Sequence, residues 1–400
     1  MNKKIISISL IVASVFTLGG CAPYKTPYAM IKPPRVAKQQ IKDNSNIKII
    51  AGKFMPEGAK LLDVNKIDNS KNIYMFDLDN DKKEEAVVFF EIEETFEKGF
   101  FILKDNGSEW KKIFDTKTEG NAISKVQFVD VNGNGEKSLL VGNLISTHAG
   151  SEYTAYTFKD NKIDKLSLGI WNKIEILNIP SQDSKKGFVY ATWTVSSPSA
   201  YLVQVIRYDG NKFTNAEDFY ASYYPKVIDY YSDIMKETPN NQLNWYYFID
   251  AQIKSGLAQD ALNSLDKVAE IKKTSKEYEI EAYMFSILRS RALGQLKNYK
   301  AAEELLNSTI QTLAQGIEAL KANPDEDAST MKNSLSDAYF ELGKVYLAEK
   351  DKNKAKENFN KSLELLNELS KNISYSSGTI DDMTANEVKE ELNKLSLGVE

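Results

Sequence analysis

The chain has very little cysteine, histidine or arginine. Its 400 residues include one cysteine, Cys21, and one histidine, His148, so an intrachain disulfide and the paired Cys or His motifs of zinc sites are excluded. Arginine occurs four times, and the other 47 of the 51 basic residues are lysine, which leaves few bidentate clamps for phosphate or carboxylate. Acidic residues outnumber basic ones by 56 to 51. This balance argues against binding of nucleic acid, which requires a basic surface.

Catalytic motifs are missing as well. The sequence contains no G-x-S-x-G elbow, no Walker loop, no H-E-x-x-H and no G-x-G-x-x-G. His148 lies in the segment LISTHAGSEY, where we interpret it as a residue of a loop or a strand end. Paired carboxylates for glycoside hydrolysis remain open, because they come from positions far apart in a sequence. We therefore expect a protein that is not an enzyme.

Long apolar runs are confined to the first residues. A basic stretch, Met1–Lys4, precedes the apolar run Ile5–Leu18, and Gly19, Gly20 and Cys21 follow. No later stretch reaches the ~18 apolar residues of a spanning helix. The pattern resembles the lipobox of bacterial lipoproteins, which implies a signal peptide at 1–20, lipidation of Cys21 with palmitate among the acyl chains, and an extracytoplasmic protein held on the cell membrane. An uncleaved anchor and an ordinary secretory peptide are the alternatives.

The next segment, 21–45, is predicted to be an extended linker. Its residues 22–45 contain four prolines and five basic residues against one acid, Asp43. Proline favours extended backbone and removes hydrogen-bond donors, so the segment resembles a semi-stiff spacer. In an alternative interpretation, its basic residues lie on anionic lipid headgroups.

Residues 46–214 have the pattern of a β-domain. Short segments such as KIIAG, AVVFF, GFFIL, SLLVG and FVYATW are rich in Ile, Val, Phe and Tyr, as strands are. Dipeptides such as Asn132-Gly133 and Asp209-Gly210 supply the positive φ angles of tight hairpins. No long amphipathic helix interrupts the segments, so parallel βαβ units are not expected.

These segments repeat. The stretch Phe76–Phe90, FDLDNDKKEEAVVFF, has an echo that starts at Phe128, FVDVNGNGEKSLLVG, and a third cycle passes through Leu177. Hairpin turns at Asp105, Asp160 and Asp209 mark the same three cycles of about fifty residues. We expect propeller-like blades or an irregular antiparallel meander. Because closed propellers use about four to eight blades, an open assembly or a sandwich remains possible.

The acidic turns resemble the calcium loops of FG-GAP (VCBS) repeats in integrin-type propellers. The resemblance implies possible calcium ligands at Asp77, Asp79, Asp81 and Glu85 in the first turn. In the second turn it implies a weaker set, Asp130, Asn132 and Asn134. Calcium binds such clusters of oxygen atoms. Lys82 stands in the first turn where a glycine is usual, and the second turn has Gly135 but fewer charges. Metal-free hairpin turns are the alternative, so no cofactor other than possible Ca²⁺ is expected.

Residues 215–400 change to a helical pattern that resembles tetratricopeptide (TPR) repeats. The unit that matches best carries the aromatic, small and Leu-Gly positions Tyr339, Leu342, Gly343, Tyr346, Ala355, Phe359 and Ser362. An earlier unit keeps Trp245, Gly256, Ala261 and Leu265. The small residues Ala261, Ala302 and Ala355 lie 41 and 53 residues apart, longer than the ~34 of a regular repeat. We expect three helical hairpins with an entry helix and a capping helix.

Together these patterns predict a two-domain β-plus-α protein, with an all-β repeat module followed by a TPR-like helical solenoid. Stacked helical hairpins form concave grooves for peptides or partner helices. We therefore predict a membrane-anchored, non-enzymatic scaffold lipoprotein, with the lipid bilayer and a protein or peptide as partners. A glycan- or peptidoglycan-binding lipoprotein, hydrolytic or not, that uses the β-module is the alternative. Tyrosine clusters at Tyr220–Tyr224, Tyr230–Tyr231 and Tyr246–Tyr247 are expected to pack where the two domains meet.

Overall fold

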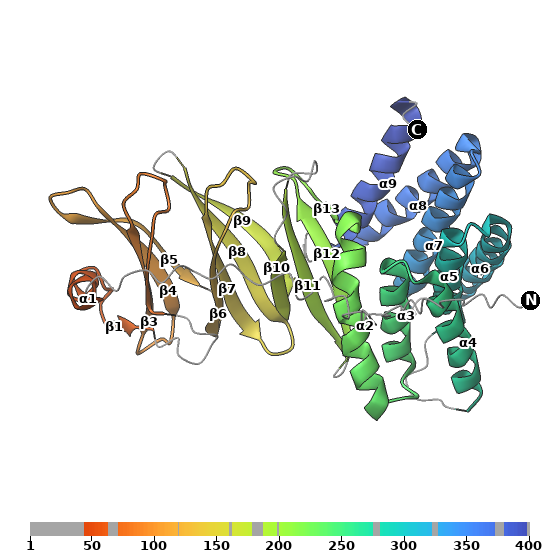
Figure 1. The fold of residues 1–400 in the computed structure, drawn as a ribbon, viewed down its shortest axis with the longest axis horizontal. Helices are drawn as coiled ribbons and strands as arrows, with labels where there is room; N and C mark the ends of the chain where they lie inside the picture. The colour runs from red at the N-terminus through yellow and green to blue at the C-terminus, as the bar shows by residue number, and fades with distance from the viewer. Residues whose placement is uncertain are drawn as a thin grey trace, which may run out of the picture. The chain divides into compact units, whose positions relative to one another are not determined.

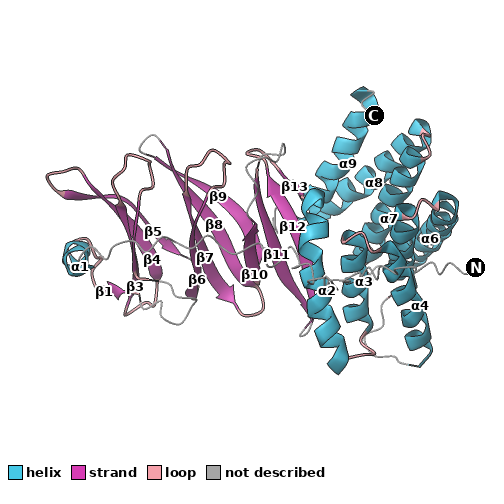
Figure 2. Ribbon diagram, in the orientation of Figure 1, coloured by secondary structure: helices cyan, strands magenta, loops and turns pink. Residues whose placement is uncertain are grey.

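The computed structural model describes residues 44–62, 71–118, 120–159, 162–177, 187–197, 200–274, 281–321, 327–372 and 380–397. They belong to one compact unit, with strands in its N-terminal part and helices in its C-terminal part (Figure 2). The predicted fold class is thereby confirmed. The predicted signal peptide, Cys21, the linker up to residue 43 and the turn residue Asp160 lie outside the described residues. Among the described helices, none has the length and apolar character needed to cross a bilayer.

Three antiparallel sheets, none of them closed, make up the strand region (Figure 1). In the first, β3 (Glu85–Ile92), β4 (Lys98–Asp105) and β5 (Trp110–Thr118) follow one another, and β1 (Ala59–Leu61) and β2 (Ile73–Phe76) pair with successive parts of β3. The second sheet has the order β6 (Ala122–Val129), β7 (Ser138–Ser146), β8 (Gly150–Lys159), β9 (Lys162–Trp171). The third has the order β10 (Lys173–Leu177), β11 (Phe188–Ser197), β12 (Ala200–Tyr208), β13 (Phe213–Asn215). The three predicted cycles thus correspond to three open meanders.

The second strand of each cycle explains the apolar runs of the sequence. The first six residues of β3, β7 and β11 are all buried, so each strand is covered on both faces. Successive side chains of a strand point to opposite faces. In β7, Leu139 and Val141 accordingly pack against the first sheet, whereas Leu140 packs against the third. Two-sided burial replaces the polar–apolar alternation of a half-exposed strand by a continuous apolar segment.

The segment KIIAG, predicted to be a strand, is instead part of helix α1 (Asn44–Gly52). Its buried side chains Ile47 and Ala51 lie one helical turn apart and pack on the outer face of the first sheet, against Val88, Phe90 and Phe101. The prediction was wrong because a five-residue apolar run does not distinguish a strand from an amphipathic turn of helix. The helix covers a sheet face that a closed propeller would bury against another blade.

The C-terminal part consists of helical hairpins. A short 3₁₀ helix, η2 (Glu217–Phe219), leads into α2 (Tyr220–Glu237). The hairpins that follow are α3 (Gln242–Lys254) with α4 (Ala258–Thr274), α5 (Ala282–Gln295) with α6 (Tyr299–Leu320) and α7 (Ser329–Ala348) with α8 (Lys352–Asn372). Helix α9 (Ile380–Leu397) comes last. Each hairpin turn has one residue of positive φ two positions after the first helix, namely Gly256, Lys297 and Lys350.

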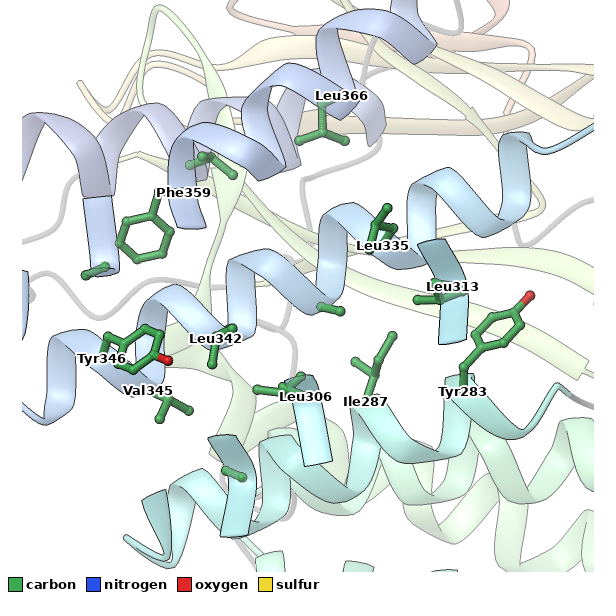
Figure 3. Packing of buried hydrophobic residues seen from close by; sticks show 14 residues of the cluster. Tyr283, Ile287, Leu306, Leu313, Leu335, Leu342, Val345, Tyr346, Phe359 and Leu366 are labelled. Atoms are coloured by element: carbon green, nitrogen blue, oxygen red, sulfur yellow. The ribbon is translucent and has the colours of Figure 1, made fainter. Parts of the chain in front are cut away.

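Two core clusters hold the hairpins together. The larger contains Leu306, Leu342, Val345 and Phe359, which point into the space between α6, α7 and α8 (Figure 3). The other joins α3, α4 and α5. Neighbouring hairpins share these clusters, as expected for a solenoid, in which each repeat packs on the next.

The third sheet and helix α2 meet in a cluster of tyrosines, as the sequence predicted. Tyr224 OH donates to the Val203 carbonyl at 2.9 Å, and Tyr231 OH donates to the Tyr201 carbonyl at 2.6 Å. The rings fill the apolar layer while each hydroxyl finds an acceptor on the sheet. Helix α2 runs without interruption through Pro225. Pro225 lies on the exposed side, so water is able to satisfy the carbonyl that its missing N–H leaves free.

Candidate functional site

The first acidic turn, between β2 and β3, folds around its own carboxylates. Asp77 Oδ2 accepts a hydrogen bond from Lys82 N at 3.0 Å, Asp79 Oδ1 accepts from Asp81 N at 3.3 Å, and Asp81 Oδ1 accepts from Lys83 N at 2.8 Å. Lys82 has a φ of 69°, the left-handed conformation that normally favours glycine. The turn is therefore held by side chains that replace backbone partners.

Glu85 lies at the inner end of this turn. It is 1% exposed, and its Oε2 accepts from Leu78 N at 2.8 Å. One oxygen atom each of Asp77, Asp79 and Glu85 lie within 4.8 Å of one another. Asp77 Oδ1 and Glu85 Oε1 are buried without a hydrogen bond. Three converging carboxylates with two unsatisfied buried oxygens have the donor chemistry that a hard cation such as Ca²⁺ prefers.

A lysine from the neighbouring strand reaches the same oxygens. The Nζ atom of Lys104, on β4, contacts Asp79 Oδ2, lies 2.9 Å from Asp81 Oδ2 and lies 3.6 Å from Glu85 Oε1. Burial alone would lower the pKa of Lys104, but its hydrogen bonds with Asp79 and Asp81 and the charge of Glu85 outweigh burial and raise it. Lys104 is therefore a permanent cation. A calcium ion at this turn would have to compete with the ammonium group for the carboxylates.

Burial shifts the pKa of Glu85 in the opposite direction to that of Lys104. Burial raises the pKa of Glu85, the Leu78 amide opposes the rise, and the neighbouring charge of Asp79 adds to it. An ionised Glu85 in this position depends on a nearby positive charge. Lys104 is the cation that lies within 4 Å of it among the described residues.

The second acidic turn, between β6 and β7, repeats two of the three hydrogen bonds of the first turn and has fewer charges. Asp130 Oδ2 accepts from Gly135 N at 2.8 Å, and Asn134 Oδ1 accepts from Glu136 N at 3.0 Å. The side chain of Asn134 also donates to Glu136 Oε2 at 2.7 Å. Asn132 is exposed. Among the described residues, Asp130 and Glu136 belong to no group of three or more converging His, Cys, Asp or Glu side chains.

Equivalent positions of the two turns carry different pairs. Glu85 and Ser138 each begin the central strand of their sheet, and Lys104 and Thr157 are their neighbours on the next strand. In the second sheet Ser138 Oγ and Thr157 Oγ1 form a hydrogen bond of 2.6 Å. A neutral hydroxyl pair thus stands where the first sheet has a buried acid and a lysine.

The residues that carry the TPR resemblance lie at helix contacts. Ala261, Ala355 and Phe359 are fully buried, Leu342 and Tyr346 are buried, and Tyr339 and Trp245 are half-buried. A Cβ atom on Gly343 would lie 2.5 Å from the ring of Phe359. Only glycine allows α7 and α8 to approach this closely. Gly256 has a φ of 80° in the first hairpin turn.

The inner helices α3, α5 and α7 border a cavity of about 670 Å³, which we call the chamber. Its other walls are β12, β13, η2, α2 and α9. The charged residues that line it are Glu217, Asp250, Lys254, Arg291, Asp337, Glu341, Lys344 and Glu387. A cavity of this size is typical of small-ligand or peptide sites. The sequence prediction placed a groove on the helices but did not include the strands as its wall.

An arginine crosses the chamber wall from α5. Arg291 Nε donates to Glu341 Oε1 at 2.8 Å, and its two terminal nitrogens lie 3.8 Å from Asp250 and from Asp337. Burial raises the pKa of Asp337, with Arg291 opposing the rise. Three acids share one guanidinium, and Lys254 and Lys344 add two positive charges on the same helices, so the excess of negative charge around the chamber comes from Glu217 and Glu387.

Helix α9 and strand β13 close one side of the chamber. Asn215 on β13 donates through Nδ2 to Glu387 Oε1 on α9, and Lys212 Nζ lies 3.4 Å from Glu390. Burial raises the pKa of Glu387 to about 7, the Asn215 amide opposes the rise, and the charge of Glu217 adds to it. Because these contacts join the strand region to the last helix, the chamber exists only in the complete unit.

Sequence reasoning missed Lys104 and the chamber residues. Lys104 is near the acidic turn only through strand pairing. A signal existed for the chamber: Asp250, Arg291 and Lys344 follow one another at the same two intervals as Ala261, Ala302 and Ala355, and so occupy equivalent positions of the three hairpins. His148 lies exposed in the turn between β7 and β8, as predicted.

Comparison with known proteins adds little. No protein-family model and no curated protein sequence matches the chain. Among solved structures, MamA 41-end from Desulfovibrio magneticus RS-1 is similar at 18% identity and a TM-score of 0.24, over 44% of this chain and 88% of that one. The MamA RS-1 ArsTM double mutant gives 17% identity and the same TM-score, over 44% and 86%. Likeness at this level carries no argument for fold or function.

Proposed function

We propose that the protein is a non-enzymatic scaffold that holds a protein or peptide partner in the chamber, while a lipid on Cys21 anchors it to the outer face of the cytoplasmic membrane. The observation that carries the proposal is the row of charged residues at equivalent positions of α3, α5 and α7, which faces a cavity instead of a packed core. Helical arrays bind extended peptides on this kind of surface.

Site-specific photo-crosslinking in detergent-solubilised membranes tests the binding role. Ala348 is exposed and lines the chamber. A photoreactive residue at Ala348 should give discrete protein or peptide adducts. The matched control is the same residue at Glu318, which is exposed on α6 and lies outside the chamber lining. Identical adducts at both positions, or none at Ala348, would rule out the chamber as the binding site.

The anchoring role rests on the sequence at Cys21, and it has a separate test. A Cys21→Ser variant should lose incorporation of labelled palmitate and move from the membrane fraction to the soluble fraction. Retention of the variant in the membrane fraction after washing with high salt would contradict anchoring through this residue. A salt wash is needed because basic residues near a membrane are attracted to anionic lipids, and it separates such attraction from anchoring through Cys21.

A further inference from the structure

Resting on the proposed function, we infer that the chamber selects a lysine-bearing, extended segment of the partner, and that Glu217 and Glu387 receive its ammonium group. The segment of the partner that enters the chamber would therefore carry positive charge. This follows from how charges are paired around the chamber.

The cations of the chamber already have partners. Lys254 Nζ lies 2.7 Å from Asp250 Oδ2, Arg291 is bonded to Glu341, and Lys344 lies 3.6 Å from Glu341 Oε2. Each is therefore compensated by a carboxylate of the protein itself. An acidic ligand would have to break one of these pairs, and truncating or displacing a partner of a buried pair is costly.

Two other carboxylates of the chamber have no ion pair of their own. Neither Glu217 nor Glu387 forms an ion pair with any residue in the described part of the chain, and Glu387 accepts only from the neutral amide of Asn215. Both line the chamber near Lys344, whose charge acts on each of them and lowers the pKa of Glu387, although its ion pair is with Glu341. A ligand ammonium group placed between them would supply the missing positive charge without disturbing an existing pair.

The chamber also suits the length of a lysine. Its lining includes Phe340, Val345 and Ala348 next to the charged groups. A lysine stem packs its methylene groups on such apolar surface while its ammonium group reaches a polar end. The side chains of Asp337 and Lys344 are 35% and 46% exposed, so solvent reaches the cavity and an incoming peptide is able to do so as well.

Cation binding should be linked to the ionisation of Glu387. Its pKa is about 7, and a bound ammonium group favours the charged carboxylate. The titratable groups that interact with Glu387 are Glu217 from η2, Lys344 from α7 and Tyr220 from α2. The other charged groups around the chamber are Asp250, Lys254, Arg291, Asp337 and Glu341. Because a lysine ligand stays protonated from pH 6 to pH 8, affinity should rise over this range as Glu387 loses its proton.

Fluorescence polarisation with the full chain in detergent tests the inference. The probe is a labelled, end-capped nonapeptide of alternating lysine and alanine. We expect it to bind, more tightly at pH 8 than at pH 6, whereas peptides with N-acetyl-lysine or glutamate in place of lysine should bind at least tenfold more weakly. The double variant Glu217→Gln/Glu387→Gln should lower the affinity of the lysine probe by at least tenfold and abolish the pH dependence.

The control variant changes the net charge equally. Glu270→Gln/Glu318→Gln removes two exposed acids of the outer helices α4 and α6 and should leave binding unchanged. Equal loss in both double variants, equal binding of the N-acetyl-lysine probe, or no binding of the lysine probe would overturn the inference. Circular dichroism confirms that each variant is folded. If crosslinking at Ala348 captures a partner while these outcomes occur, the scaffold function stands and only the lysine selectivity fails.

Discussion

The two acidic turns share a backbone arrangement but differ in how their charge is balanced. In both, an Asp accepts the amide five residues ahead, at 3.0 Å for Asp77 and 2.8 Å for Asp130. The first turn adds a buried acid and Lys104, and the second has the hydroxyl pair of Ser138 and Thr157. The shared turn geometry therefore does not depend on the charge pair. The repeats differ in the groups at equivalent positions: the first has Lys104 and the acids that pair with it, and the second has a neutral hydroxyl pair.

The largest expected effect comes from removing that cation. Lys104→Met keeps most of the aliphatic stem but leaves Asp79, Asp81 and the buried Glu85 without their ammonium partner. Breaking a largely buried pair in this way should lower the free energy of unfolding by about 3 kcal/mol, measured by urea denaturation at pH 7. A loss below about 1 kcal/mol would mean that solvent already compensates Glu85.

The matched change in the second sheet should cost less. Thr157→Val removes one neutral hydroxyl beside the buried Ser138 and should lower stability by about 1 kcal/mol. Placing the hydroxyl pair in the first sheet, with Glu85→Ser and Lys104→Thr together, should recover more than half of the loss caused by Lys104→Met. No recovery would show that the two pairs are not interchangeable.

The acidic turns could be predicted from the sequence, but the pairing of Glu85 with Lys104 could not. The acidic turns and the central strands could be predicted because their residues are neighbours in the chain. Lys104 follows Glu85 by nineteen positions and meets it only because β3 pairs with β4 in a particular register. The chamber combines side chains from strands and helices, such as Gln204 and Arg291, that no local pattern connects. Helix α1 was missed because its apolar run is too short to show a helical period.

The sequence predicts possible calcium binding at the first turn, and Lys104 determines when that binding should be seen. In the wild-type chain we expect the same melting temperature in EDTA and in millimolar calcium, because the ammonium group competes for the carboxylates. In Lys104→Met, calcium should raise the melting temperature, since an ion that binds only the folded state stabilises it by mass action. Magnesium, which demands a smaller octahedral site, is the control ion.

Two results would contradict this expectation. A rise in the wild-type protein would mean that calcium displaces Lys104, as the resemblance to calcium loops implies. No rise in Lys104→Met would mean that Asp77, Asp79 and Glu85 form too few ligands for the ion. Differential scanning calorimetry distinguishes both from the expected outcome.

The smallest expected effect concerns the bend of each turn. Lys82 has a φ of 69° where the second turn has Gly135 at 88°. Left-handed backbone costs a residue other than glycine roughly 1–2 kcal/mol, and glycine loses about 0.5–1 kcal/mol more backbone entropy on folding. Lys82→Gly should therefore stabilise the protein by about 0.5 kcal/mol.

The reverse change, Gly135→Ala, should destabilise the protein by a similar amount, about 0.5 kcal/mol. A Cβ atom on Gly135 meets nothing within 4 Å, so the cost is conformational and not steric. Urea denaturation of both variants measures the two effects. Destabilisation by Lys82→Gly would show that the Lys82 side chain itself contributes to the turn. The two turns would then differ in their bend as well, because Gly135 has no side chain to make such a contribution.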